Sequence, residues 1–178
     1  MKVAIVYSSK SGFTKKYAQW IANETLGDLI VLQDLREQCL NQYDKILYGG
    51  GLYAGGINGL KKFKSLTEHL PKEKLIYFAT GVTPAREEVV NELIHGNFSE
   101  AEQEGLHFFY FRGGFNYALL GFVDKVLMNV MKFMIKKKKE DQRTPDERGM
   151  LAAYDQPLDF CNSKEIEPLI AFINKCEV

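Results

Sequence analysis

Short apolar segments alternate with segments of helical periodicity along most of the chain. Each apolar segment is bounded by glycine, proline or polar residues, a pattern typical of strands buried in a parallel sheet with both faces covered. Five such strands are predicted: Val3–Tyr7, Leu29–Leu32, Ile46–Tyr48, Leu75–Ala79 and Leu106–Phe111.

Helices are expected between these strands, at residues 14–26 and 58–70, from Pro84 onward, and at residues 163–175. Gly27 and Pro71 are expected to end the first two helices, and Ser163 to be the N-cap of the last. The alternation predicts an α/β fold with a doubly wound sheet of five parallel strands and helices on both faces. We expect a single domain over residues 1–178, with a helical insertion at about 113–162.

Ligands of doubly wound sheets bind beyond the carboxyl ends of the strands. After the first strand comes a serine-rich turn, in which the hydroxyls of Ser9, Ser11 and Thr14 can converge on one phosphate. Gly12 lets backbone N–H groups approach the phosphate, and the next helix adds its N-terminal dipole. The alternative is an ordinary turn with Thr14 as a helix cap. The predicted phosphate site comprises Ser9, Lys10, Ser11, Gly12, Phe13 and Thr14.

The spacing Ser-x-Ser-Gly-x-Thr after an N-terminal strand resembles the FMN-phosphate signature of the flavodoxin family, with serines in place of two threonines. It is neither the G-x-G-x-x-G of dinucleotide folds nor the G-x-x-x-x-G-K-[ST] of nucleotide-hydrolysing proteins. The resemblance therefore implies a flavodoxin-like domain with FMN as its cofactor, in preference to FAD, NAD or ATP.

Two further loops, rich in glycine, follow the third and fourth strands. In flavodoxins the first carries a wall of the isoalloxazine site, and Tyr53 or Leu52 is the candidate here. The second bonds the pyrimidine edge in that family. Here it lacks an aromatic residue, which would leave one flavin face open to a substrate. The predicted contacts from these two loops are Gly51, Leu52, Tyr53, Ala54, Gly55, Thr80, Gly81, Val82 and Thr83, and a glycine turn after the fifth strand adds Gly113 and Gly114. Arg86 is a weaker candidate, equally compatible with a surface position at the start of a helix. Arg112 and Tyr117 are weak candidates for which a solvated surface is favoured.

The insertion is dominated by a predicted helix from Leu119 to about Lys139, rich in Leu, Val, Phe and Met. Lysines fall near one stripe of this helix, and the rest of its circumference is apolar. One interpretation is a helix packed on the sheet with its lysines in water. The alternatives are peripheral contact with an anionic membrane, contact with an apolar substrate, or a dimer surface.

The whole layout is similar to the menaquinone-dependent protoporphyrinogen dehydrogenase branch of flavodoxin-like proteins. The likeness rests on Tyr43-Asp44-Lys45, Gly113-Gly114-Phe115-Asn116-Tyr117, the Lys/Met-rich helix, Thr144-Pro145-Asp146 and Tyr154-Asp155. It implies an FMN-dependent oxidoreductase that oxidises protoporphyrinogen IX in haem biosynthesis and passes electrons to a quinone. The substrate class would then be a quinone or a tetrapyrrole.

Composition narrows the function classes. The chain has 23 Lys and Arg residues and 23 Asp and Glu residues, so its formal net charge is zero. It therefore lacks the strong acidity that steers electron-carrier flavodoxins to their partners. The neutral charge also gives no sign of a nucleic-acid partner. The three cysteines have no metal or redox spacing, and no metal is expected. A cytoplasmic protein, possibly membrane-associated, is predicted. A flavodoxin-type electron carrier and an NAD(P)H-quinone reductase remain alternatives, and no catalytic acid or base is identified.

Overall fold

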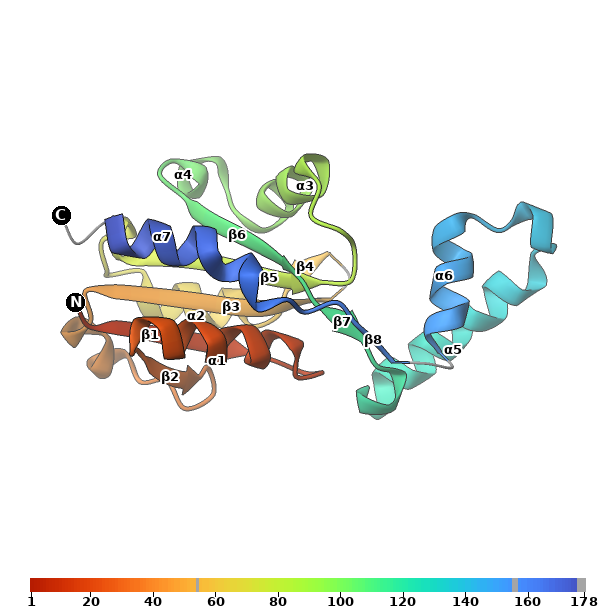
Figure 1. Cartoon of the computed structure of the whole chain (residues 1–178), viewed down its shortest axis with the longest axis horizontal. Helices are drawn as coiled ribbons and strands as arrows, with labels where there is room; N and C mark the ends of the chain where they lie inside the picture. Colours follow the sequence, from red (N-terminus) through yellow and green to blue (C-terminus); the bar gives the residue numbers. More distant parts are fainter. Residues whose placement is uncertain (54, 155–156, 176–178) are drawn as a thin grey trace. The chain divides into compact units, whose positions relative to one another are not determined.

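The computed structural model describes residues 1–53, 55–154 and 157–175 (Figure 1). The chain forms two compact units. The sheet unit comprises Met1–Gly113 and Phe160–Val178, and the hairpin unit comprises Gly114–Asp159.

The sheet unit contains five parallel strands in the order β2-β1-β3-β5-β6, as predicted for a doubly wound α/β fold. The strands lie close to the apolar runs of the sequence, and most extend one or two residues further at their carboxyl ends. Their bounds are β1 Val3–Ser8, β2 Asp28–Val31, β3 Lys45–Tyr53, β5 Leu75–Gly81 and β6 His107–Arg112.

The third strand differs most from its prediction, because it continues through the three glycines that were expected to close it. A Cβ built on Gly49 would fall 2.0 Å from Cζ of Phe78 on the neighbouring strand β5. Glycine is therefore required there by the packing of the Phe78 ring and not by a turn. The strand turns back only after Tyr53, where β4 (Gly56–Ile57) pairs with it antiparallel.

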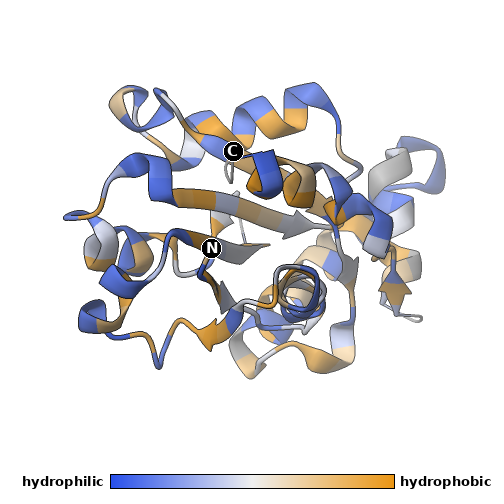
Figure 2. Ribbon diagram, turned by 60° about the vertical axis from the view of Figure 1, so that its left-hand side comes forward, coloured by the Kyte–Doolittle hydropathy of each residue, from blue (hydrophilic) through white to orange (hydrophobic). Residues whose placement is uncertain are grey.

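Helices cover both faces of the sheet. Side chains of α1 (Phe13–Thr25) and α7 (Glu167–Lys175) are buried in one apolar cluster, as Tyr17 and Leu169 illustrate. Phe63 of α2 (Leu60–Thr67) belongs to the other cluster, on the opposite face, together with Phe98. Figure 2 shows the strands between the two layers as predominantly hydrophobic ribbon.

The remaining described helices of the sheet unit are α3, α4 and three short 3-10 turns. The helix predicted from Pro84 begins three residues later and is followed by a second, shorter one. The bounds are α3 Glu87–Asn97, α4 Glu100–Gln103, η1 Glu37–Gln42, η2 Lys72–Lys74 and η5 Ser163–Ile166; η3 Tyr117–Leu119 and η4 Glu140–Gln142 lie in the hairpin unit.

Two predicted helix ends are corrected. Leu26, and not Gly27, takes the left-handed conformation after α1, with φ of 50°. Ser163 is not the N-cap of the last helix: Asn162 accepts a hydrogen bond from the backbone of Lys164, and the 3-10 turn η5 precedes α7. The asparagine side chain therefore caps the turn one residue earlier than the serine was expected to.

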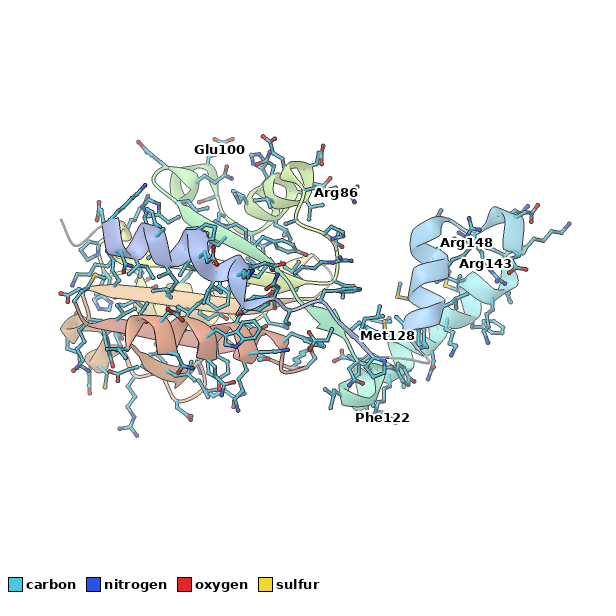
Figure 3. All side chains as sticks on the ribbon, in the orientation of Figure 1. Arg86, Glu100, Phe122, Met128, Arg143 and Arg148 are labelled. Atoms are coloured by element: carbon cyan, nitrogen blue, oxygen red, sulfur yellow. The ribbon has the colours of Figure 1, made fainter. Side chains whose placement is uncertain are left out.

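The hairpin unit comprises α5 (Phe122–Lys137), α6 (Pro145–Ala153) and a short antiparallel ribbon of β7 (Gly114–Phe115) and β8 (Leu158–Asp159) (Figure 3). Helix α6 was not predicted, although its signal is present. The backbone N–H of Glu147 donates to Oγ1 of Thr144, and Glu147 accepts from the backbone of Thr144, which is a capping box. Arg143 donates to the last carbonyls of α5.

Among the helices that the structure describes, none is both long and apolar enough to cross a membrane.

Candidate functional site

The predicted site loops meet at one edge of the sheet. Ser8 at the end of β1 pairs with Gly50 of β3, Gly51 pairs with Thr80 of β5, and Gly81 pairs with Arg112 of β6. Because the strands are parallel, the loops that follow them emerge together (Figure 1). The chain leaves β1 toward β2 and leaves β3 toward β5, so the topological switch point lies between β1 and β3.

The turn between β1 and α1 has the geometry of an anion site. Gly12 has φ of 89°, a conformation that strains other residues, and its N–H donates to Oγ of Ser9 at 3.1 Å. In the part of the chain that the structure describes, no side chain caps the first turn of α1. The N–H groups that a helix leaves without an intrahelical partner are therefore not taken up by a cap, which suits a phosphate.

The three hydroxyls predicted to converge on a phosphate have different surroundings. Oγ of Ser9 accepts the Gly12 N–H, which leaves its own hydrogen for another acceptor. Ser11 is half-buried on the same turn. Thr14 is only 2% exposed, and its Oγ1 lies 2.7 Å from Oγ1 of Thr80. Thr14 therefore ties the turn to the carboxyl end of β5.

The side chains of Tyr53 and Leu52 differ in their exposure to solvent. Tyr53 is 40% exposed, and Nζ of Lys10 lies over its ring, 4.1 Å from the centroid. Leu52 is half-buried, with its Cδ1 2.8 Å from where a Cβ on Gly81 would be. Tyr53 is thus the exposed aromatic of this loop, whereas Leu52 packs under the end of β5. Ala54, also predicted as a contact, lies outside the described residues.

Asn97 holds this loop in place and was missed by the sequence analysis. Its Oδ1 accepts from the N–H of Ile57 at 2.9 Å, and its Nδ2 donates to the carbonyl of Gly55 at 2.9 Å. Gly55 itself has φ of 81°. An asparagine at the end of α3 carries no local signal of a partner some forty residues earlier, so only the tertiary structure reveals this role.

The loop after β5 is held by side chains of β6. Nε of Arg112 donates to the carbonyl of Val82 at 3.1 Å, and the Tyr110 hydroxyl donates to the carbonyl of Thr83 at 2.7 Å. Burial raises the pKa of Tyr110 to about 12, so the hydroxyl stays protonated as a donor. Arg112 also stacks on Phe160. Its observed role is to shape this loop.

The remaining predicted residues are placed as follows. The Gly113 N–H donates to the carbonyl of Gly81 at 2.7 Å, which extends the β5–β6 pairing by one residue. Gly114 and Tyr117 belong to the hairpin unit. Arg86 is exposed and immediately precedes α3 (Figure 3).

Beneath the edge, Tyr17 joins three segments of the sheet unit. Its hydroxyl lies 2.7 Å from Oε2 of Glu165 and 2.8 Å from the carbonyl of Arg112, and it accepts from the N–H of Asn162. Burial raises the pKa of Tyr17 well above its ordinary value, and the carboxylate of Glu165 adds to the shift. This node fixes α1 against β6 and the segment that leads into α7.

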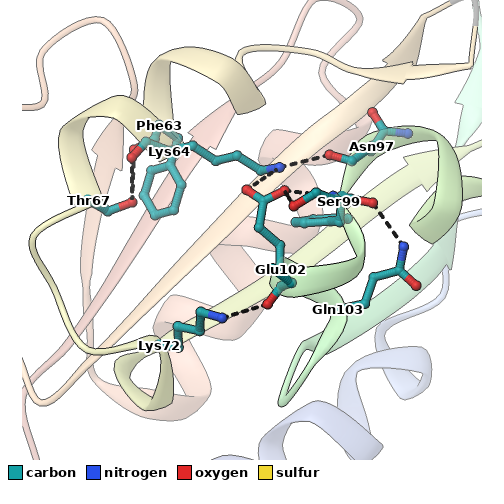
Figure 4. Close-up of polar contacts among 10 residues, drawn as sticks. Phe63, Lys64, Thr67, Lys72, Asn97, Ser99, Glu102 and Gln103 are labelled. Carbon is teal, nitrogen blue, oxygen red and sulfur yellow. Dashed lines mark hydrogen bonds and ion pairs between the residues drawn. The ribbon is translucent and has the colours of Figure 1, made fainter.

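A separate cavity of about 430 Å³ lies at the other end of the sheet, between α2, α4 and the starts of β5 and β6. Nζ of Lys64 lies 2.8 Å from Oε1 of Glu102 in its wall, and Lys72 donates to the carbonyl of Ala101 (Figure 4). Burial raises the pKa of Glu102, but the bonds from Lys64 and Ser99 outweigh it and hold the pKa below its usual range. These contacts are structural.

Among the described residues, no group of three His, Cys, Asp or Glu side chains could hold a metal ion. His107 lies at the opposite end of β6 and packs on Phe172 of α7. His69 lies 3.3 Å from a carboxylate oxygen of Glu37, also away from the loop edge.

The chain belongs to the flavodoxin domain family, whose sequence model matches residues 4–143. This match agrees with the observed sheet order and with the phosphate-site signature after β1. A search among curated proteins gave no significant match.

Solved structures similar to this chain are distant. An archaeal flavodoxin has 20% identity and a TM-score of 0.45, over 64% of this chain and 85% of that one. A flavoprotein of Lactobacillus acidophilus in complex with FMN has 20% identity and a TM-score of 0.39, over 62% and 91%. An NADH:FMN oxidoreductase in its apo form has 19% identity and a TM-score of 0.41, over 62% and 74%.

Proposed function

We propose that this protein binds FMN at the loop edge of the sheet unit and acts as a flavoprotein oxidoreductase. The observation that carries the proposal is the turn from Ser9 to Gly12, which leads into the uncapped first turn of α1. Membership of the flavodoxin domain family supports it, as does the FMN complex of the Lactobacillus flavoprotein.

The residues around the turn suit the parts of FMN. Backbone N–H groups, the Ser9 and Ser11 hydroxyls and the Lys10 ammonium suit the phosphate. Exposed Tyr53 offers one wall for the isoalloxazine ring. Backbone groups of Gly81, Val82 and Thr83 are available to its polar edge.

When bound, FMN supplies two-electron redox chemistry, and the protein supplies binding, orientation and electrostatics. The aromatic residue below the β5 loop is Tyr110, and its hydroxyl is bonded to the Thr83 carbonyl. The loop itself presents Val82, which is 38% exposed. One face of the site is therefore left to a bulky apolar reactant.

The specific reaction that we propose is oxidation of a porphyrinogen such as protoporphyrinogen IX, with a quinone as acceptor. In each cycle the donor loses two electrons and two protons, and the quinone takes up two electrons and two protons to form the quinol. The resemblance to the protoporphyrinogen dehydrogenase branch supports this proposal, and so does a net charge of zero.

The first test titrates the purified protein with FMN and with riboflavin, and measures binding by the quenching of flavin fluorescence. Inorganic phosphate is added as a competitor. Tight binding of FMN, weaker binding of riboflavin and competition by phosphate would support the phosphate site. Equal binding of FMN and riboflavin would refute it.

The second test addresses the reaction. The flavin-loaded protein is reduced anaerobically with dithionite and mixed with a menaquinone analogue, and then with protoporphyrinogen and the quinone together. Quinone-dependent formation of the porphyrin above the spontaneous rate supports the enzyme. Rapid reduction by NADH or NADPH favours the NAD(P)H-quinone reductase, and exchange only with a protein reductase favours the electron carrier.

A further inference from the structure

One side of α5 presents a continuous apolar surface to solvent, which we call the outer face. Phe122, Phe133 and Met134 on it are 83%, 60% and 62% exposed. Figure 3 shows Phe122 at the start of this helix. The outer face consists of Phe122, Val126, Leu127, Val130, Met131, Phe133 and Met134.

The opposite side of α5 packs within the hairpin unit and carries two of its lysines. Nζ of Lys132 lies 4.4 Å from the ring centroid of Tyr154, and Lys125 donates to the carbonyl of Ala118. The Tyr154 hydroxyl donates to the carbonyl of Met128, and Ile135 is buried. Polar side chains thus contact the rest of the unit while the apolar face is exposed, the reverse of an ordinary surface helix.

The charges near the outer face are positive. Asp124 is the only acidic residue of α5, and it is half-buried. Lys136, Lys137 and Lys139 are exposed at the carboxyl end. Nζ of Lys137 lies 4.6 Å from the ring centroid of Phe133, so an ammonium group sits directly beside the outer face.

The size and charge of the outer face select its partner. From Phe122 to Met134 it extends about 18 Å along the helix axis, longer than a small ligand needs. A second copy of the chain would bring the same lysines and, from the facing helix, only the half-buried carboxylate of Asp124. A bilayer with anionic lipids offers both an apolar phase for the phenylalanines and phosphates for the lysines.

We propose that the outer face of α5 docks on the surface of an anionic membrane, with α5 in the plane of the interface and Lys136, Lys137 and Lys139 on lipid headgroups. Lys132 is not part of this surface, because its ammonium group packs on Tyr154. The proposal stands whether or not the sheet unit binds FMN.

The first experiment measures co-sedimentation of the full chain with vesicles of phosphatidylcholine alone and of phosphatidylcholine with phosphatidylglycerol. We expect binding to the anionic vesicles, weakened by salt. The double variant Lys136→Gln/Lys137→Gln should bind about 30-fold more weakly, from about 1 kcal/mol per lysine. The matched control Lys61→Gln/Lys62→Gln removes two adjacent exposed lysines of α2 and should bind like the unmodified protein.

The second experiment tests the apolar contact. Phe133→Trp should gain a blue-shifted emission with anionic vesicles and be quenched by brominated lipids, beyond the signal of the native Trp20. Phe122→Gln/Phe133→Gln should lose most of the binding, with an unchanged far-ultraviolet circular dichroism spectrum.

Three results would overturn the proposal. The first is no binding to anionic vesicles. The second is equal loss in the α2 control. The third is that the protein does not bind vesicles but forms a concentration-dependent dimer, which the Phe133→Gln substitution dissociates. That result would assign the outer face to a second copy of the chain.

Discussion

The ammonium group of Lys10 lies over the ring of Tyr53, 4.1 Å from its centroid. Lys10 belongs to the turn proposed to hold the FMN phosphate, and Tyr53 to the loop proposed to flank the isoalloxazine ring. A cation–π contact at an exposed site contributes about 0.5–1 kcal/mol. The contact therefore links two parts of the proposed site that lie far apart in the sequence.

Replacing Lys10 should discriminate between flavins. We expect Lys10→Gln to weaken FMN binding at least about tenfold, because a hydrogen bond to a charged group contributes about 1.5–3 kcal/mol. Riboflavin, which lacks the phosphate, should bind almost as before. Tyr53→Leu should instead weaken both flavins. Fluorescence titrations of the two flavins measure this, with Lys61→Gln as the control; equal losses of both flavins in Lys10→Gln would contradict the assignment.

Replacing Asn97 should loosen the loop that carries Tyr53, although Asn97 itself is not proposed to contact the cofactor. Asn97→Ala removes the bonds to the N–H of Ile57 and the carbonyl of Gly55. We expect a loss of about 1–3 kcal/mol in the free energy of unfolding, together with weaker FMN binding. Urea denaturation measures the first and fluorescence the second. Asn91→Ala, at an exposed position of the same helix, is the control, and a matching loss there would contradict the role of Asn97.

Much of the fold could be predicted from the sequence because its apolar runs are short and clearly bounded. The run Val3–Tyr7 and strand β1 agree to within one residue. The end of β3 was not predictable in this way, since Gly49 is a strand residue only because Phe78 fills the space beside it. Helix α6 was missed because Thr144 was interpreted only as part of the segment Thr144-Pro145-Asp146, and the capping residue Glu147 was not considered with it.

The candidate site divides in the same way. The turn after β1 could be proposed as a phosphate site because its residues are consecutive, so Ser9 and Gly12 can be recognised together. Asn97 could not be found, because its partners are distant in sequence. The bond between the hydroxyls of Thr14 and Thr80 could not be predicted for the same reason, and the Thr14 hydroxyl was expected to bind a phosphate instead.

His107 should make stability depend on pH in the acidic range. Burial lowers the pKa of its imidazole, and the charge of Lys45 lowers it further. In the unfolded chain a histidine has a pKa of about 6.5, so below that value the unfolded state binds more protons than the folded state. The free energy of unfolding should therefore fall as the pH falls below about 6.5.

The variant His107→Phe isolates this effect, because it keeps a ring against Phe172 and removes the titrating group. Urea denaturation at about pH 8 and about pH 5 should show a smaller fall in the variant than in the unmodified protein. An identical fall in both would show that other groups account for the acid sensitivity.

Thr14 and Thr80 should be energetically coupled, because their hydroxyls are buried and bonded to each other at 2.7 Å. Thr14→Val or Thr80→Val leaves the partner hydroxyl buried without its bond, at a cost of about 1–3 kcal/mol. The double variant leaves no such hydroxyl, so its loss in the free energy of unfolding should be clearly smaller than the sum of the single losses. Urea denaturation of all four proteins measures the coupling, and Thr83→Val, at an exposed position nearby, should change stability by less than about 0.5 kcal/mol. If the two losses simply add, the bond does not hold α1 to the end of β5, and the phosphate turn must be positioned by its backbone alone.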